Sequence, residues 1–377
     1  MLPTPRGRGA SLADVLEDSL AAVRGERNGL SLPPVDRAVV VLVDGLGAEN
    51  LRAAAGHART LAGAMRTKSD VIATGAPTTT AAAIATLTTG ALPGAHGMVS
   101  YSALDPERDV VMNQLRGLDD LEQPEDWMLV PTVFERAASL GLDALAVGHE
   151  RYRDSGYTRA VLRGAEYLGG RTPADRVDAL LERLGDSSWR GIGYLYAAEI
   201  DMAGHDEGWR SREWSDALEA VDAAVATLVG ALDARTGLLV TADHGMVDVA
   251  PHGRLVIPDA SPLWSGVRHV GGEHRLLHLY LEPDADAGEC ARRWAESEGE
   301  RAWVATRAAA IEAGWFGDVA DVVRPRIGDV LVAARKDVAF YTEEALAGSA
   351  GSMVGQHGSW SPAEQRVPLL RFGAFTR

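Results

Sequence analysis

Six acidic and histidine side chains lie next to apolar segments that the sequence predicts to be buried strands. They are Asp44, Asp201, His205, Asp243, His244 and His357. In an open α/β sheet, ligands bind beyond the carboxyl ends of the strands, so these positions are the first candidates for a functional site. Carboxylate oxygens and imidazole nitrogens are donors that Zn²⁺ and similar divalent ions accept. Three Asp and three His at one sheet edge therefore predict a metal site.

Each of these residues alone also has an ordinary structural explanation. An Asp after a strand can begin a turn, as Asp44 does in VDG. The spacing of Asp201 and His205 fits one helical face or a loop around an ion, but it also fits a helix N-cap followed by a surface histidine. The prediction of a metal site depends on their joint occurrence.

A hydroxyl nucleophile is available in the segment GAPTTTAAAIATLTTGALPGAHG at residues 75–97. Thr78, Thr79 and Thr80 precede an alanine-rich helical run, where threonine commonly caps the helix. The N-terminus of a helix also favours a phosphate group, and a metal ion can stabilise an alkoxide there. From the residues alone, capping and nucleophilic roles both stay open.

The set of motifs resembles the nucleotide pyrophosphatase/phosphodiesterase family of the alkaline phosphatase superfamily, from about residue 36 onward. The family motifs occur in the family's order. They are VDG at 43–45, PTTT at 77–80, TGALPGAHG at 89–97, DMAGH at 201–205, DHGM at 243–246 and GQHG at 355–358. This resemblance implies a hydrolase with two divalent metal ions, Zn²⁺ first and Mn²⁺ as the alternative, and a small-molecule phosphoester substrate.

The resemblance also assigns a role to each residue of the motifs. Thr80 would be the catalytic nucleophile that forms a phosphothreonine intermediate, and its oxygen would also contact the first metal ion. The first ion would be held by Asp44, Asp243 and His244 together with Thr80, and the second by Asp201, His205 and His357. Two such ions clamp the attacking and leaving oxygens of an in-line displacement.

The sequence departs from the family pattern at two places near Thr80. The family has Phe-Pro-Asn directly after the nucleophile, whereas this chain has Ala81, Ala82 and Ala83, which leaves the nucleotide preference open. We expect these alanines to form an apolar wall for one organic group of a diester. Where the family has an Asn that donates to the phosphoryl oxygen, this chain has Tyr101, whose phenol can also donate, so Tyr101 is a second catalytic candidate.

The residues around Thr80 distinguish several other activities of the superfamily. A sulfatase needs C/S-x-P-x-R at its nucleophile, and a superfamily monoesterase needs an arginine just after it; neither pattern surrounds Thr80. We therefore expect a phosphodiesterase or nucleotide pyrophosphatase. Hydrolysis of a phosphonate such as phosphonoacetate, a monoesterase of the same superfamily, and a metal-dependent binding module without catalysis remain the alternatives.

Composition narrows the class of protein further. The formal net charge of −16 argues against nucleic-acid binding, because phosphate backbones are bound by Lys and Arg. Cys290 is the only cysteine, so any metal must be held by Asp, Glu and His. The N-terminus has no apolar region typical of a signal peptide, and no run approaches the length of a membrane span, which predicts a cytoplasmic location. The oligomeric state is left open.

Apolar runs alternating with helical patterns predict an α/β fold with a mostly parallel central sheet, and the resemblance implies an alkaline-phosphatase-like three-layer α/β/α sandwich. The expected core strands lie at 36–43, 142–147, 192–197, 238–241 and 367–372, and the expected helices at 133–140, 173–184 and 213–234. Residues 1–35 form an N-terminal extension with a helix, 36–253 and 337–377 the metallohydrolase core, and 254–336 an inserted cap.

The remaining histidines and two arginines are expected to have structural or surface roles. His96 is expected to pack in the interior, and the others to have structural or surface roles. Arg151 and Arg153 soon follow a predicted strand and could meet a substrate phosphate, but the sequence favours a solvated basic surface for both.

Overall fold

The computed structural model describes residues 1–5 and 9–376. Its centre is a seven-stranded sheet in the order β2-β17-β8-β1-β7-β5-β6. The strands are β1 Arg37–Val43, β2 Val71–Ala73, β5 Asp143–Gly148, β6 Glu166–Gly169, β7 Gly191–Ala197, β8 Thr236–Thr241 and β17 Arg366–Gly373. Strands β8, β1, β7, β5 and β6 run parallel, whereas β17 pairs antiparallel with both β8 and β2. The predicted mostly parallel sheet is confirmed.

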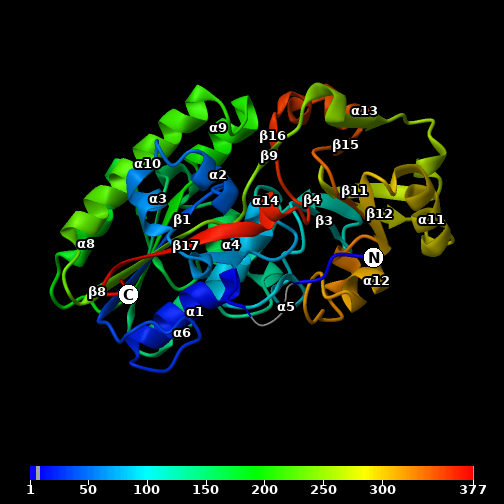
Figure 1. Ribbon diagram of the computed structural model, residues 1–377. Coiled ribbons are helices and arrows are strands. Elements are labelled where there is room, and N and C mark those ends of the chain that lie inside the picture. Colours follow the sequence, from blue (N-terminus) through cyan, green and yellow to red (C-terminus); the bar gives the residue numbers. More distant parts are fainter. Residues whose placement is uncertain (6–8, 377) are drawn as a thin grey trace.

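Helices cover both faces of this sheet (Figure 1), which makes the three layers of the predicted sandwich. One layer contains α1 Leu12–Val23, α4 Thr80–Thr89, α6 Val133–Ser139 and α7 Gly156–Val161. The other contains α2 Ala48–Ala53, α3 Arg59–Ala64, α8 Pro173–Leu184, α9 Glu199–Glu207 and α10 Arg212–Ala231. The first helix, α1, packs on β1 and α4, so the N-terminal segment is part of the layered body.

The central elements form for reasons that are visible in the sequence. Every residue of β1 is buried, as expected for a continuous apolar strand covered on both faces. Helix α8 begins with Thr172 as N-cap, whose side chain accepts from the Asp175 N–H, and with Pro173 in the first turn. The predicted bounds of α8 agree with the structure, and α10 ends three residues earlier than predicted.

A second sheet lies beside the central one, at the right of Figure 1, with strand order β11-β12-β14-β13. Its strands are β11 Val267–Glu273, β12 Leu276–Leu281, β13 Ala302–Thr306 and β14 Val330–Ala334, and all of its pairings are antiparallel. Helices α11 Ala287–Glu298 and α12 Arg307–Glu312 pack on it. The predicted boundaries of the inserted cap, residues 254 and 336, stay a prediction. Strand β10, inside the predicted cap, pairs with β15, which lies outside it.

The remaining elements are short. The short helices are α5 Pro93–His96, α13 Glu343–Ala347 and α14 Pro362–Gln365, and the short strands are β3 Ser102–Asp105, β4 Val110–Asn113, β9 Val247–Asp248, β10 Arg254–Ile257, β15 Ala339–Thr342 and β16 Gly355–Gln356. The 3₁₀ turns are η1 Lys68–Asp70, η2 Gly117–Asp120, η3 Pro124–Trp127, η4 Glu150–Tyr152, η5 Pro251–Gly253, η6 Pro262–Trp264, η7 Arg324–Arg326 and η8 Ser349–Ser352. Among the described residues, no helix combines the length and apolarity needed to cross a membrane.

A buried ion pair joins the second sheet to the core. Arg275, in the turn between β11 and β12, donates from Nε and Nη2 to the two carboxylate oxygens of Glu364 on α14. Glu364 Oε1 also accepts from the Ser359 N–H, and the Glu364 carbonyl accepts from the Gly245 N–H. The pair therefore holds two core loops, one just after His244 and one just after His357.

Candidate active site

The six candidate residues lie together at one end of the central sheet. Asp44 follows β1, and Asp243 and His244 follow β8, the neighbour of β1. Asp201 and His205 lie on α9, the helix directly after β7, which is the other neighbour of β1. His357 follows the short strand β16. A helix, α9, begins directly after β7. Because Asp201 and His205 are four residues apart on this helix, their side chains lie on the same face of it.

Asp44, Asp243 and His244 form the first group, with one donor atom from each lying within 4.8 Å of the others. Nε2 of His244 is 3.3 Å from Asp44 Oδ1 and 3.6 Å from Asp243 Oδ2. Asp243 Oδ1 is turned toward the backbone, where it accepts from the N–H groups of Gly45 and His244. All three side chains are buried.

Asp201, His205 and His357 form the second group. Nε2 of His205 is 3.3 Å from Asp201 Oδ2 and 3.2 Å from Nε2 of His357, which in turn is 3.9 Å from Asp201 Oδ1. The rings of His244 and His357 stack with centroids 3.7 Å apart and an interplanar angle of 17°. Donor atoms of Asp201, His244 and His357 also lie within 4.8 Å of one another, so His244 stands between the two groups.

The backbone orients all three imidazoles in the same way. Nδ1 of His357 is 2.8 Å from the Thr78 carbonyl oxygen, Nδ1 of His205 is 2.8 Å from that of Gly355, and Nδ1 of His244 is 3.2 Å from that of Gly245. A carbonyl accepts only from a protonated nitrogen, so each Nδ1 carries the hydrogen and each Nε2 lone pair points into the site. This is the usual arrangement around a metal-ligating histidine.

The donor set fits divalent cations. Burial raises the pKa of Asp201 and that of Asp243 to about 7, and burial together with the neighbouring Asp243 charge raises the pKa of Asp44 well above its usual range. Asp201 Oδ1 and Asp243 Oδ2 are buried without a hydrogen-bond partner. In the part of the chain that the structure describes, no Lys or Arg forms an ion pair with these carboxylates, so a bound cation is the natural counter-charge.

Thr80 lies against the first group. It is the first residue of α4, is 9% exposed, and places Oγ1 3.2 Å from His244 Nε2 and 3.5 Å from Asp44 Oδ1. The hydroxyl of Thr78, by contrast, donates to the Ser359 carbonyl and accepts from the Gly358 N–H, so it fastens the His357 loop. Thr79 is the N-cap residue. Of the three threonines, Thr80 is the one whose hydroxyl contacts candidate metal ligands.

Four supporting residues were not found from the sequence. The Tyr196 hydroxyl donates to Asp44, and the Tyr157 hydroxyl donates to the carbonyls of Thr80 and Ala81. Tyr196 lies in an apolar strand that suggests only packing, and Tyr157 lies in a polar segment, SGYTR at 155–159, outside the family motifs. Glu273 Oε2 is 3.4 Å from His357 Nδ1, and Glu364 supports the same loop through Ser359. Glu273 lies on a strand of the second sheet and Glu364 on a short helix after the GQHG motif, and neither belongs to a motif that would indicate its role.

The alanines after Thr80 correct one expectation. Ala81, Ala82 and Ala83 are 0%, 1% and 2% exposed, because α4 is enclosed by the surrounding helices and sheet. They pack in the interior and do not form the expected apolar wall for a substrate.

Tyr101 is 37% exposed directly before β3, and no hydrogen bond joins its hydroxyl to a described residue. Its catalytic role stays a prediction. His96 is buried, as expected for an interior residue. Its Nε2 is 3.0 Å from Thr86 Oγ1.

The sequence matches the family model described as type I phosphodiesterase / nucleotide pyrophosphatase over residues 38–360. A search of curated proteins gives no match.

Solved structures with the same fold include murine ectonucleotide pyrophosphatase / phosphodiesterase 5, with 18% identity, a TM-score of 0.67, and coverage of 89% of this chain and 88% of that one. A variant of the murine protein with one Thr replaced by Ala, described as inactive, was solved in complex with AMP. Phosphonoacetate hydrolase from Sinorhizobium meliloti 1021, in complex with phosphonoformate, has 19% identity, a TM-score of 0.68, and coverage of 90% and 91%.

Proposed function

This chain belongs to the type I phosphodiesterase / nucleotide pyrophosphatase family, and on that premise we propose that it hydrolyses phosphodiester or phosphoanhydride bonds of small molecules with Thr80 as nucleophile. The observation that carries the proposal is the position of Thr80 Oγ1, 3.2 Å from His244 Nε2 at the N-terminus of α4. The inactivity of the Thr-to-Ala variant of the murine relative supports a threonine nucleophile in this fold.

In the proposed site, Asp44, Asp243 and His244 would hold one divalent ion, and a second group would hold another. That group consists of Asp201, His205 and His357. Two bound ions would neutralise the buried carboxylates and supply positive charge for the phosphoryl oxygens and the attacking oxygen. Zn²⁺ suits a mixed carboxylate and imidazole donor set, and Mn²⁺ is the alternative.

The protein's own groups prepare Thr80 for attack. Tyr157 holds the backbone of the first turn of α4, because its hydroxyl donates to the carbonyls of Thr80 and Ala81. Free N–H groups at the start of this helix favour the negative charge of a phosphoryl group. Thr80 Oγ1 forms a bond to phosphorus, the bond to the leaving group breaks, and that group departs with a proton. Water then cleaves the phosphothreonine, which restores the hydroxyl.

The test is turnover by metal-loaded protein on a panel of a diester, a monoester, a nucleotide anhydride and phosphonoacetate, together with mass analysis of the quenched protein before and after proteolytic digestion. Wild type is expected to cleave the diester or anhydride and to gain one phosphoryl or phosphodiester group on a peptide containing Thr80. Exclusive cleavage of phosphonoacetate would favour the phosphonate hydrolase instead. Binding of AMP without turnover of any substrate would favour a metal-dependent binding module.

A further inference from the structure

Glu273 is a buried carboxylate that the second sheet places behind a candidate metal ligand. It is the last residue of β11, its side chain is 9% exposed, and its Oε2 is 3.4 Å from Nδ1 of His357. Nε2 of His357 faces the second group. The ion pairs of His205 and His244 among the described residues all run from Nε2 to the aspartates of the site. His357 alone of the three imidazoles thus has a carboxylate on its far side.

The carboxylate can approach His357 closely because the following residue is a glycine. A Cβ at Gly358 would lie 2.5 Å from Cδ of Glu273 and 2.8 Å from its Oε1. Gly358 also has a φ of +129°, a conformation that residues with a side chain rarely adopt. Any larger residue at this position would push the carboxylate away from the imidazole. The last glycine of the GQHG segment therefore leaves the space that Glu273 occupies.

His274, in the two-residue turn after Glu273, fixes this turn against the same loop. Its ring stacks on Tyr341 with centroids 4.2 Å apart and an interplanar angle of 19°. The Tyr341 hydroxyl accepts from Nε2 of Gln356 at 3.2 Å, and Gln356 directly precedes His357. These contacts keep Glu273 next to His357.

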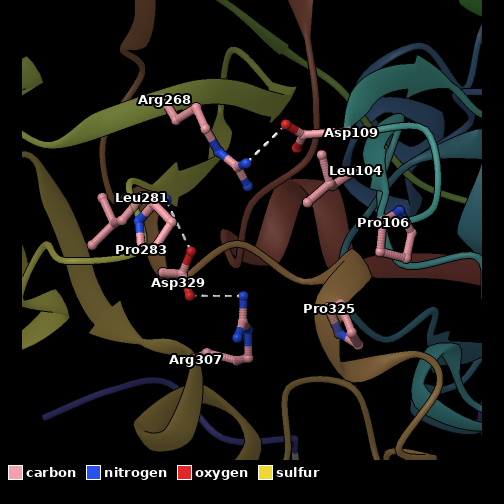
Figure 2. A pocket seen from close by; sticks show the side chains of 9 residues that line it. All are labelled: Leu104, Pro106, Asp109, Arg268, Leu281, Pro283, Arg307, Pro325 and Asp329. Carbon is pink, nitrogen blue, oxygen red and sulfur yellow. Dashed lines mark hydrogen bonds and ion pairs between the residues drawn. The ribbon is translucent and has the colours of Figure 1, made fainter.

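The arginines at both ends of β11 already have acidic partners. At its start, Arg268 pairs with Asp109 in the β3–β4 turn at 2.8 Å (Figure 2). Beyond its end, Arg275 pairs with Glu364 and donates from Nη1 to two backbone carbonyls. In the described part of the chain, no Lys or Arg forms an ion pair with Glu273, and its Oε1 is buried without a hydrogen-bond partner. The carboxylate of Glu273 therefore lacks a cationic partner within the protein.

The two candidate metal groups differ in their negative charge. Asp44 and Asp243 would neutralise both positive charges of a divalent ion in the first group. The second group has one carboxylate, Asp201, beside two imidazoles whose Nε2 atoms are unprotonated and neutral. A divalent ion there would keep one positive charge unbalanced at a largely buried position, which is unfavourable. Glu273, behind His357, carries the one negative charge that is needed.

We propose that Glu273 is the positioning residue of the second metal group, where its carboxylate orients His357 and balances the charge that Asp201 alone leaves on a divalent ion. The inference rests on the proposed function, because that function requires the second group. It makes a residue of the second sheet responsible for the affinity of one ion. A carboxylate behind a ligating imidazole fixes the ring and makes its nitrogen a better donor.

The test measures the affinities of both ions in wild type, Glu273→Gln, Glu273→Asp and the control Glu282→Gln. The full chain is stripped of metal and titrated with Zn²⁺ in competition with a chromophoric chelator of known affinity. Gln has the shape of Glu and still accepts a hydrogen bond, but it carries no charge. Glu282 is the matched control, because it belongs to the same sheet region, directly after β12, and is exposed.

Glu273→Gln is expected to bind one Zn²⁺ as tightly as wild type and the other about 10- to 100-fold more weakly. Glu273→Asp should recover part of this loss, because it keeps the charge, and Glu282→Gln should match wild type. Equal affinities of Glu273→Gln and wild type for both ions overturn the inference and leave the proposed function in place. Fewer than two ions bound by wild type would contradict both.

A stability measurement separates this role from a merely structural one. In metal-free protein, Glu273→Gln removes a buried carboxylate that has no cationic partner, so its urea midpoint should equal that of wild type or exceed it. A lower midpoint in the presence of chelator would show that Glu273 supports the fold itself, and it overturns the inference.

A double variant assigns the effect to one of the two groups. Asp201→Asn removes the aspartate of the second group and is expected to keep the first ion. Adding Glu273→Gln to Asp201→Asn should leave the affinity for this remaining ion unchanged. A further loss of about 10-fold or more would place the effect of Glu273 at the first group and overturn the inference.

Discussion

The guanidinium of Arg275 and the carboxylate of Glu364 form a two-point ion pair with both N···O distances at 2.7 Å and both side chains fully buried. Glu364 also accepts from the Ser359 N–H, two residues after His357. The pair therefore ties the turn of the second sheet to the loop that supplies a candidate metal ligand. The nearby Arg275 charge keeps the pKa of Glu364 below its usual range despite burial.

Glu364→Gln should destabilise the protein by about 3–5 kcal/mol, because it leaves a buried guanidinium without its counter-charge. It should also weaken metal retention at the second group, because the Ser359 loop loses its anchor. Urea denaturation and metal content measure the two effects. The matched control is Glu296→Gln, which breaks an exposed Arg292 pair on α11 and should change stability by less than about 0.5 kcal/mol. Equal stabilities of the two variants would contradict this role.

Removal of divalent ions should abolish hydrolysis, with Zn²⁺ or Mn²⁺ restoring it. Metal analysis should find about two ions per chain in wild type and about one in Asp201→Asn, because Asp201 belongs to the second group alone. Asp206→Asn is the control, since Asp206 lies on the same helix but is exposed. Fewer than one tightly bound ion per wild-type chain, with activity indifferent to chelator, would remove the two-metal proposal.

Thr80→Ala should lower kcat by several orders of magnitude and leave the metal content nearly unchanged, because Asp44, Asp243 and His244 remain. Thr79→Ala is the control in the adjacent position, and it should retain most of the turnover. Steady-state kinetics and metal analysis of both variants check this. Loss of turnover in Thr79→Ala with retention in Thr80→Ala would show that the wrong hydroxyl has been assigned.

Bis-p-nitrophenyl phosphate should be cleaved with a higher kcat/KM than p-nitrophenyl phosphate. The extra charged oxygen of a monoester needs a cationic partner, and the three residues after Thr80 are buried alanines that offer none. If Tyr101 donates to a phosphoryl oxygen, Tyr101→Phe should slow diester cleavage by about a hundredfold. A wild-type preference for the monoester would contradict the diesterase assignment, and an unaltered rate in Tyr101→Phe would remove Tyr101 from the site.

Acidification should destabilise the fold partly through His96, whose pKa is lowered to about 3 by burial. Between this value and the unfolded pKa of about 6.5, the unfolded chain binds more protons, so stability is lost as the pH falls below about 6.5. At pH 5 the loss is about 2 kcal/mol. His96→Asn keeps an acceptor for the Met98 N–H but does not titrate, so its stability deficit relative to wild type should shrink by that amount between pH 7.5 and 5.

Urea denaturation in the presence of chelator measures this difference, because the other titrating groups are common to both proteins and cancel. A deficit that stays constant from pH 7.5 to 5 would show that His96 is not the group responsible.

Local sequence patterns predicted much of the central sheet and the ordering of its helices. The continuous apolar run of β1 and the Thr172–Pro173 start of α8 contain their own structural signals. The six candidate ligands were found because each follows or precedes a strand in a family motif. Their meeting at one end of the sheet follows from parallel topology, which places the ends of β8, β1 and β7 side by side.

The supporting contacts could not be predicted in the same way. Arg275 and Glu364 lie 89 residues apart, and neither belongs to a motif, so only the packing of the second sheet on α14 brings them together. Tyr196 lies inside an apolar strand, so the sequence indicates only a packing role and gives no sign of the hydrogen bond that its hydroxyl makes. The burial of Ala81 was also missed, because an alanine-rich helix gives no polar face from which to infer its orientation.

The stacking of His244 on His357 makes the two donor groups mechanically dependent on each other. Neither ring can tilt without displacing its neighbour at a centroid distance of 3.7 Å. Fixing the position of one imidazole therefore also fixes the other. The conformational entropy of the two rings is lost when the first is fixed and is not lost again for the second. In the proposed two-metal site, an ion bound at one group would therefore favour binding of an ion at the other.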